Sequence, residues 1–186
     1  MRVIPTKLEG VVLIEPDVFG DARGFFMESY HAEKYAAAGL PYHFVQDNHS
    51  LSEPAGTLRG LHYQLSPKAQ TKLVRVLAGA IYDVAVDIRP GSPTFGQWVG
   101  YVLSAANKRQ LLVPQGFAHG FCTIVPNTEV SYKVDQFYAP THDRGIRWDD
   151  PTLSIPWPTD RPLLSPKDEQ HPYLADAQLE LEGENG

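Results

Sequence analysis

The stretch that decides the fold reads GTLRGLHYQ over residues 56–64, and a second stretch, PQGFAH, follows at residues 114–119. Each places a histidine shortly after a glycine, His62 after Gly56 and His119 after Gly116. Alternating apolar and polar residues continue from both, as is typical of half-buried strands. The pattern predicts a β-barrel in which both histidines face one cavity.

These two stretches resemble the paired motifs of cupin-type double-stranded β-helix barrels. Most cupins hold a metal there with a His-x-His pair and an acidic residue, but here Gln64 replaces the second histidine and the acidic ligand has no clear counterpart. Lys72 stands seven residues before the turn glycine Gly79, and its ammonium would repel a divalent cation. The sequence therefore predicts a pocket that works without metal, by acid–base chemistry.

The composition of the 186-residue chain fits one globular domain, with 42% hydrophobic and 20% charged residues. A net charge of −6 and a pI near 5.6 disfavour general binding to nucleic acid or anionic membranes. Cys122 is the sole cysteine, so no intrachain disulfide forms and a cytoplasmic location is expected. Neither a secretory leader nor a membrane span is expected.

Short β-branched and aromatic runs bounded by glycine and proline predict a series of strands. Only the alanine-rich run 29–38, which ends at Gly39, predicts a helix. The ratio favours an all-β jelly-roll barrel with a few short peripheral helices. The predicted strands cover residues 44–49, 57–64, 72–77, 80–88, 98–103, 110–113, 120–125 and 129–137.

A single domain is predicted over residues 1–186, because no linker or internal repeat divides the chain. Residues 1–43 are expected to hold N-terminal strands and a short helix, and residues 44–138 the barrel core. Residues 139–174 are expected to wrap along the surface. The acidic tail, residues 175–186, is expected to fray.

Strand alternation predicts which polar side chains enter the barrel. Lys72 and Tyr132 are each the polar member of an otherwise apolar row, which indicates that both tips project into a cavity. Arg59 lies opposite His62 by parity. The two reach one pocket only if the strand bends near Gly60, where glycine permits a bulge.

A cavity that holds His62, His119, Lys72 and Tyr132 offers a base, an acid and a cation. Imidazole takes a proton at physiological pH, tyrosine delivers one, and lysine stabilises an oxyanion on a carbonyl oxygen. These groups suit proton removal next to a ketone. Return of the proton from the opposite face inverts the carbon, which is epimerisation.

A carboxylate that orients His62 would complete the base, and spacing leaves both Asp83 and Asp168 open. Structural roles are also open: a barrel histidine is often hydrogen-bonded packing, a lysine usually points to water, and a tyrosine often serves the core. Residue chemistry alone therefore predicts a polar pocket with acid–base chemistry and stops there.

From residue 19 to about residue 168, the chain resembles the dTDP-4-dehydrorhamnose 3,5-epimerase family. The resemblance implies an isomerase of dTDP-L-rhamnose biosynthesis. Such an enzyme converts dTDP-4-dehydro-6-deoxy-D-glucose to dTDP-4-dehydro-L-rhamnose by moving protons at C3 and C5 through an enolate. The matching segments, in the family's order, are FGDARGFFME (19–28), FVQDNHS (44–50), LRGLHYQ (58–64), KLVRV (72–76), VPQGFAHGF (113–121), YKVDQFY (132–138) and LSPKD (164–168).

The resemblance also implies catalytic roles for particular residues. His62 corresponds to the base, and Asp168 rather than Asp83 corresponds to its carboxylate partner. Asp83 corresponds instead to the partner of His119. Tyr132 is similar to the acid on the far face of the sugar.

A nucleotide-sugar site and a homodimer follow from the same resemblance. Lys72 corresponds to a cation near the C4 oxygen, and the segment around Arg23 is similar to one that reaches in from a second subunit. Family members often carry glutamate where this chain has Asp143, so that contact is one methylene shorter. No cofactor is implied. The implied substrate-binding residues are Arg23, Phe25, Glu28, Gln46, Asp47, Asn48, Arg59, Lys72, His119, Tyr138, Asp143 and Lys167.

Three other functions compete with this one. An epimerase acting only at C3 or only at C5, in an antibiotic deoxysugar pathway, would use the same residues. A metal-dependent cupin isomerase or oxygenase would bind an ion, which Gln64 and Lys72 disfavour. A non-catalytic sugar-binding jelly roll would have no need of His62 or Tyr132.

Overall fold

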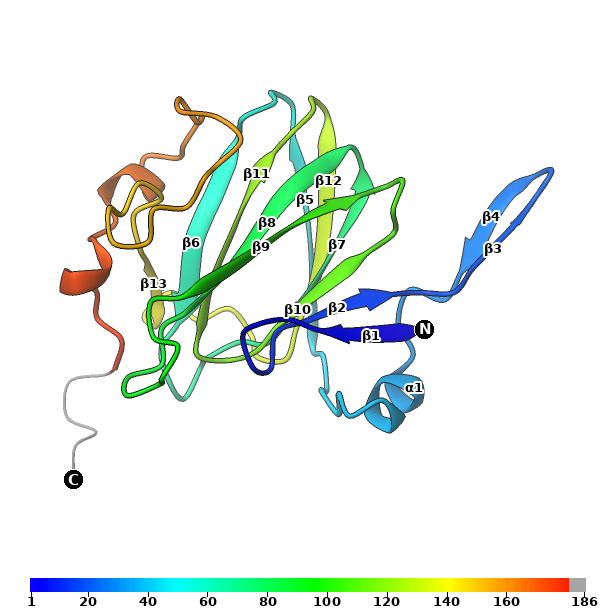
Figure 1. The fold of residues 1–186 in the computed structure, drawn as a ribbon, viewed down its shortest axis with the longest axis horizontal. Helices are drawn as coiled ribbons and strands as arrows, with labels where there is room; N and C mark the ends of the chain where they lie inside the picture. The colour runs from blue at the N-terminus through cyan, green and yellow to red at the C-terminus, as the bar shows by residue number, and fades with distance from the viewer. Residues whose placement is uncertain (181–186) are drawn as a thin grey trace.

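The computed structural model describes residues 1–180, whose strands form two antiparallel sheets that face each other as a barrel (Figure 1). One sheet has the order β1-β2-β10-β7-β12-β5 and the other β13-β6-β11-β8-β9. The all-β jelly-roll prediction is confirmed. The barrel strands are β1 (Arg2–Pro5), β2 (Val12–Glu15), β5 (Gln46–Ser52), β6 (Leu58–Gln64), β7 (Lys72–Ala78), β8 (Ala80–Asp87), β9 (Trp98–Ser104), β10 (Gln110–Val113), β11 (Phe117–Thr123), β12 (Thr128–Val134) and β13 (Asp143–Gly145).

A two-stranded hairpin, β3 (Val18–Asp21) with β4 (Gly24–Met27), extends away from the barrel at the right of Figure 1. The helix α1 (Ala32–Ala37) follows it and packs under the six-stranded sheet. Two 3₁₀ turns, η1 (Asp168–Gln170) and η2 (Leu174–Asp176), lie in the C-terminal segment on the opposite side of the molecule. The β3–β4 hairpin, called the arm below, and the C-terminal segment therefore lie on opposite sides of the barrel.

Three sequence predictions differ in detail from the structure. The helix begins at Ala32 rather than at residue 29, since His31 is extended and the Ser29 carbonyl accepts a hydrogen bond from Gln110 Nε2 at 2.9 Å. Strand β11 begins at Phe117, three residues before the predicted start. The turn at Gly79 is expected from its position between two predicted strands; a hairpin would keep those strands in one sheet, but the turn carries the chain from one sheet into the other.

The main core lies between the two sheets and is built from inward-facing aliphatic and aromatic residues of both. Burial of this surface is the principal driving force for closing the barrel. It fills one end of the barrel and leaves the other end to polar side chains. Its fully buried members include Val74, Ile81, Leu103, Leu111 and Val130.

A second core lies on the outer face of the five-stranded sheet, beneath the C-terminal segment. Residues 175–180 were predicted to fray, yet Ala177 and Leu179 pack here and Tyr63 Oη donates to the Gln178 carbonyl at 2.7 Å. The alternating apolar residues of this tail explain the difference, because they find an exposed sheet face to cover. The rest of the tail prediction, residues 181–186, lies outside the described residues.

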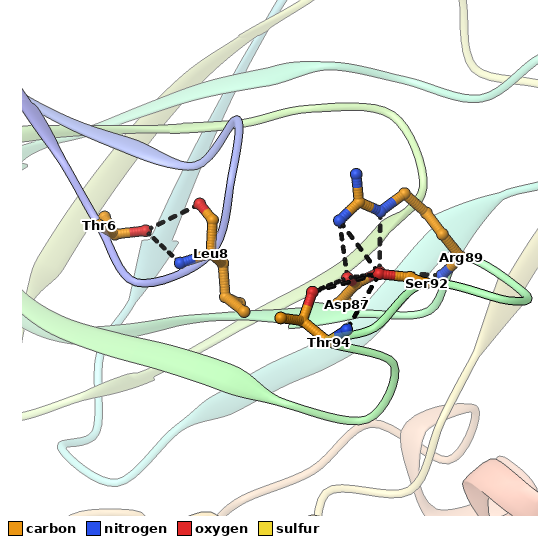
Figure 2. A network of polar contacts seen from close by, with 6 residues as sticks. All are labelled: Thr6, Leu8, Asp87, Arg89, Ser92 and Thr94. Atoms are coloured by element: carbon orange, nitrogen blue, oxygen red, sulfur yellow. Dashed lines mark hydrogen bonds and ion pairs between the residues drawn. The ribbon is translucent and has the colours of Figure 1, made fainter.

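The loop between β8 and β9 is organised by the buried carboxylate of Asp87 (Figure 2). It accepts hydrogen bonds from Arg89 Nε at 2.9 Å, Ser92 Oγ at 2.7 Å and Thr94 Oγ1 at 2.5 Å. Burial alone would raise the pKa of Asp87, but these bonds outweigh it and hold that pKa well below its usual range. The loop is thus held by a buried carboxylate whose charge is stabilised by the side chains that bond to it.

None of the helices within residues 1–180 combines the length and the apolar character needed to cross a bilayer.

Candidate active site

A cavity of about 530 Å³ opens between the two sheets at the polar end of the barrel. Strands β5, β7 and β12 supply one wall, β6 and β11 the other, and residues 163–168 of the C-terminal segment close one side. Most of the predicted site residues meet here. Those that line the cavity are Gln46, Asn48, Arg59, His62, Lys72, His119, Tyr132, Tyr138, Asp143, Lys167 and Asp168.

The predicted bend near Gly60 is present, and it explains how Arg59 and His62 share the cavity. The pairing of β6 with β11 changes register between these two residues, so that His119 pairs with His62 and Phe121 with Arg59. Gly60 makes this possible, because a Cβ there would stand 2.5 Å from the Cα of Gly120. An extra residue on one strand turns both side chains to one side.

His62 and Asp168 form a close pair, with His62 Nε2 2.5 Å from Asp168 Oδ1. Asp168 is 3% exposed, and its backbone N–H donates to Ser165 Oγ at 3.1 Å, which holds the turn. Burial lowers the pKa of His62, although the carboxylate opposes that shift. For Asp168 burial acts to raise the pKa, and contacts with His171 and His62 outweigh it and hold the pKa low. The dyad therefore consists of a neutral imidazole beside a carboxylate at neutral pH.

Lys72 is 8% exposed, and its Nζ lies 3.4 Å from the carbonyl oxygen of His62. Burial lowers its pKa to about 8, opposed in part by the charges of Asp143 and Asp83. The ammonium enters the cavity from the sheet opposite His62, as the alternation of β7 predicts. It is thus a cation held close to the dyad without a carboxylate bonded to it among residues 1–180.

Tyr132 lies on β12, where it pairs with Val74 of β7 and Asn48 of β5. Burial raises the pKa of its phenol, and the positive charge of Arg59 opposes the shift. The hydroxyl is therefore protonated throughout the neutral range. Because β12 belongs to the six-stranded sheet and His62 to the five-stranded one, a phenol and an imidazole enter one cavity from facing walls.

His119 forms a second buried imidazole–carboxylate pair, with Nε2 2.7 Å from Asp83 Oδ1. The structure thus sorts the two aspartates that spacing left open: Asp168 belongs to His62 and Asp83 to His119. Asp83 is fully buried behind its histidine and does not line the cavity. It orients His119 from the rear.

Polar groups at the mouth of the cavity are linked to one another. Gln46 Nε2 donates to Asn48 Oδ1 at 2.9 Å, and Tyr138 Oη donates to Asp143 Oδ2 at 3.0 Å. Asp143 also forms an ion pair with Lys167. The carboxylate of Asp143 thus links Tyr138 to Lys167.

Four predicted binding residues lie outside this cavity. Asp47 points to the other face of β5 and pairs with Lys133 at 2.9 Å, because it alternates with Gln46 and Asn48. The other three belong to the arm and its continuation: Arg23 pairs with Asp21, Glu28 pairs with Lys34, and Phe25 is 57% exposed with Lys108 Nζ 3.8 Å from its ring centre.

His171 is a site residue that the sequence analysis missed. Its Nε2 lies 3.3 Å from Asp168 Oδ1, outside the lining of the substrate cavity. The spacing of three residues from Asp168, on one turn, was the available signal, but a histidine in a polar surface turn carries little information by itself.

The nitrogens of His62 and His171 and one oxygen of Asp168 lie within 4.8 Å of one another, a spacing that a divalent ion can use. Both nitrogens approach the same oxygen, Oδ1, instead of surrounding an open centre. The charge of Lys72 also acts on His62 and disfavours a dication there. We therefore interpret the trio as a hydrogen-bonding cluster.

Comparison with known proteins gives one family. The family model for dTDP-4-dehydrorhamnose 3,5-epimerase matches residues 5–176. A dTDP-4-dehydrorhamnose 3,5-epimerase of Pseudomonas aeruginosa is 55% identical, covering 95% of this chain and 98% of its own.

Two solved structures show the same fold. The dTDP-4-dehydrorhamnose 3,5-epimerase of Bacillus anthracis, with TDP and PPi bound, is 58% identical with a TM-score of 0.91, covering 92% of this chain and 98% of its own. The dTDP-6-deoxy-D-glucose-3,5-epimerase of Legionella pneumophila, in complex with dTDP-4-keto-L-rhamnose, is 49% identical with a TM-score of 0.90, covering 94% and 93%. The chain belongs to the dTDP-4-dehydrorhamnose 3,5-epimerase family.

Proposed function

We propose that this protein converts dTDP-4-dehydro-6-deoxy-D-glucose to dTDP-4-dehydro-L-rhamnose by epimerising C3 and C5, a step of dTDP-L-rhamnose biosynthesis. The observation that carries the proposal is the entry of His62 and Tyr132 into one cavity from facing sheets. A base on one side of a sugar ring and an acid on the other are what inversion of a carbon requires.

In this proposal His62 removes the proton from C3 or C5, and the electron pair of the broken C–H bond moves into an enolate at C4. Asp168 stabilises the imidazolium that forms. Lys72 stabilises the negative charge on the C4 oxygen. Tyr132 then donates its phenolic proton to the opposite face of the same carbon, which inverts it.

The other cavity residues are proposed to bind and orient the nucleotide sugar. His119, oriented by Asp83, serves as a hydrogen-bonding group beside His62. Arg59 supplies a cation for the diphosphate. The remaining proposed contacts come from Gln46, Asn48, Tyr138, Asp143 and Lys167.

Deuterium labelling tests the number of carbons that react. Turnover of dTDP-4-dehydro-6-deoxy-D-glucose in deuterated water should place deuterium at both C3 and C5, as located by proton NMR. Label at one carbon alone would favour the single-centre epimerase instead. A folded wild-type protein that places label at neither C3 nor C5 would refute the proposed function.

The arm supports a further part of the proposal, a homodimer in which β3 and β4 complete the partner's site. Phe19, Phe25 and Phe26 are each more than half exposed on this hairpin, which is unusual for a surface meant to face water. Arg23 lies at the tip of the hairpin and does not line the cavity of its own chain. Asp47, on the outer face of β5, is proposed to bind only if the arm or the partner brings ligand to that face.

Mixing two inactive variants tests the shared site. If Arg23 serves the partner's cavity, dimers that combine an Arg23→Ala chain with a His62→Ala chain contain one intact site, and activity recovers after co-refolding. If Arg23 serves its own cavity or none, the mixture stays as inactive as its parts. Light scattering of the wild-type protein gives the subunit number independently.

We also propose a cytoplasmic location, which suits a chain whose one thiol, Cys122, is buried and unpaired within the described residues.

A further inference from the structure

His171 approaches the catalytic carboxylate from behind. It directly follows η1, the turn that carries Asp168, and its side chain is 8% exposed. It lines a second cavity, between η1, β13 and η2, and is absent from the lining of the substrate cavity. His171 therefore reaches Asp168 without a place from which to touch the sugar.

The ring of His171 is held close to the dyad by its surroundings. Gly145 of β13 pairs directly with His62 of β6, and a Cβ at Gly145 would stand 2.3 Å from His171 Nε2. The imidazole thus occupies space that exists because residue 145 has no side chain. It meets the ring of His62 edge to face, with 5.5 Å between centroids and 78° between planes.

The Nε2 atom of His171 is buried and, among residues 1–180, has no hydrogen bond of good geometry. Asp168 Oδ1 is the polar atom beside it, at 3.3 Å. A buried ring nitrogen lowers the stability of the fold unless it interacts with a polar partner. Its one available partner is the carboxylate that faces the base.

We propose that His171 is a positioning residue of this epimerase, whose imidazole holds the Asp168 carboxylate in place against His62 from the side away from the substrate. The proposal rests on the roles proposed above for His62 and Asp168. Through Oδ1, the two imidazoles share one acceptor. A second donor beside that oxygen withdraws part of the charge that would stabilise a protonated His62.

The expected direction follows from this sharing. A His171 that donates to Asp168 makes protonation of His62 less favourable, so loss of His171 should raise the pKa of His62. Burial of Asp168 opposes its low pKa, and the contact with His171 is the foremost among those that lower it. The charged and titratable groups around His171 are His62 and Tyr63 of β6, Asp143 and Arg144 of β13, Lys167 and Asp168 before it, and Asp176 of η2.

The experiment compares His171→Ala with wild-type protein by the pH dependence of kcat/KM. Its acid limb should move up by about half a pH unit, less than the roughly 1–2 units that one hydrogen bond to a charged group is worth, because His171 acts on His62 only through Asp168. We expect kcat to fall by roughly threefold to tenfold while KM changes little, because His171 does not line the substrate cavity. Gln170→Ala, an exposed neighbour on the same turn, is the matched control and should change neither quantity.

Two further variants separate positioning from folding. His171→Gln keeps an N–H donor, so it should recover most of kcat. Gly145→Ala pushes the His171 ring off the carboxylate without altering either residue, and should shift the acid limb in the same direction. Combined with His171→Ala, it should add little further shift, since both changes break the same contact.

NMR titration of the His62 imidazole in the folded protein gives a readout that needs no turnover. A His62 pKa that is equal in wild type and in folded His171→Ala would overturn this proposal, even if the enzyme is an epimerase. An upward shift in a protein without epimerase activity would instead support the contact and refute the proposed function. A fall in kcat with an unmoved acid limb, unrescued by His171→Gln, would mark His171 as structural and also overturn the proposal.

Discussion

At the scale of single residues, the site depends on how burial changes proton affinity. His62 and Lys72 are both pushed toward their neutral forms, whereas Tyr132 is pushed toward its protonated form. A neutral imidazole, a protonated phenol and an ammonium are the three states that the proposed chemistry requires. The cavity thus supplies them together in a window around neutral pH.

The pH profile of wild-type kcat should therefore be bell-shaped. Its acid limb reports His62, whose lowered pKa keeps the base unprotonated below the usual imidazole range. Its alkaline limb should begin near pH 8, because Lys72 loses its charge as the pH rises through its pKa of about 8. Lys72→Arg keeps a positive charge at high pH, so this limb should disappear while the maximum rate falls. A wild-type rate that stays level from pH 7 to 10 would contradict the role of Lys72.

Substitution of the acid and the base should affect turnover more than binding. His62→Ala and Tyr132→Phe should each lower kcat by about 10²–10⁴-fold, the usual cost of a missing general acid or base. Binding of dTDP, followed by calorimetry, should stay within a few-fold of wild type because the nucleotide contacts are kept. Glu33→Ala, an exposed residue of α1 outside the cavity lining, is a control for handling and folding. Wild-type kcat in His62→Ala would end the assignment of the base.

At the scale of elements, the loop that joins β8 to β9 is held by side-chain hydrogen bonds to the buried Asp87 carboxylate. Asp87→Ala leaves the partners of a buried carboxylate unsatisfied and should lower the free energy of unfolding by about 2–4 kcal/mol. Urea denaturation measures the loss, and Ser92→Ala, which removes one bond, should cost about 1 kcal/mol. Equal stability of Asp87→Ala and wild type would show that the loop does not need this centre.

The same network gives stability a pH dependence of known sign. A carboxylate whose folded pKa is depressed contributes stability above its unfolded pKa, near 4, and loses that contribution as the pH falls toward the folded value. The wild-type protein should therefore lose more stability than Asp87→Asn between pH 5 and pH 2.

Sequence reasoning succeeded where one strand carries its own pattern. The alternating rows of β7 and β12 gave the inward direction of Lys72 and Tyr132, and the glycine in β6 gave the bulge at Gly60. It was wrong about the start of β11, since Gly120 was taken as a boundary when it is a mid-strand residue pressed against Gly60. A glycine required by a neighbouring strand cannot be told from a turn glycine within its own strand.

At the scale of the whole molecule, the site is assembled from parts that local patterns do not connect. The pairing of Asp168 with His62 spans more than a hundred residues, and only the family resemblance chose it over Asp83. His171 and the packed tail depend on how the C-terminal segment covers the five-stranded sheet. Such contacts arise from tertiary packing, so the spacing of residues along the chain does not predict which of them will meet.

The late position of Asp168 in the chain has a consequence for how the enzyme becomes active. Most of the barrel can assemble from residues before 139, whereas Asp143, Lys167 and Asp168 come later in the chain, so a refolding chain can regain its β-sheet circular-dichroism signal while still inert. Turnover should return last, and its lag is set by docking of the C-terminal segment, because contacts between residues far apart in the chain form slowly. Recovered catalysis would then mark completion of the native state more faithfully than circular dichroism does.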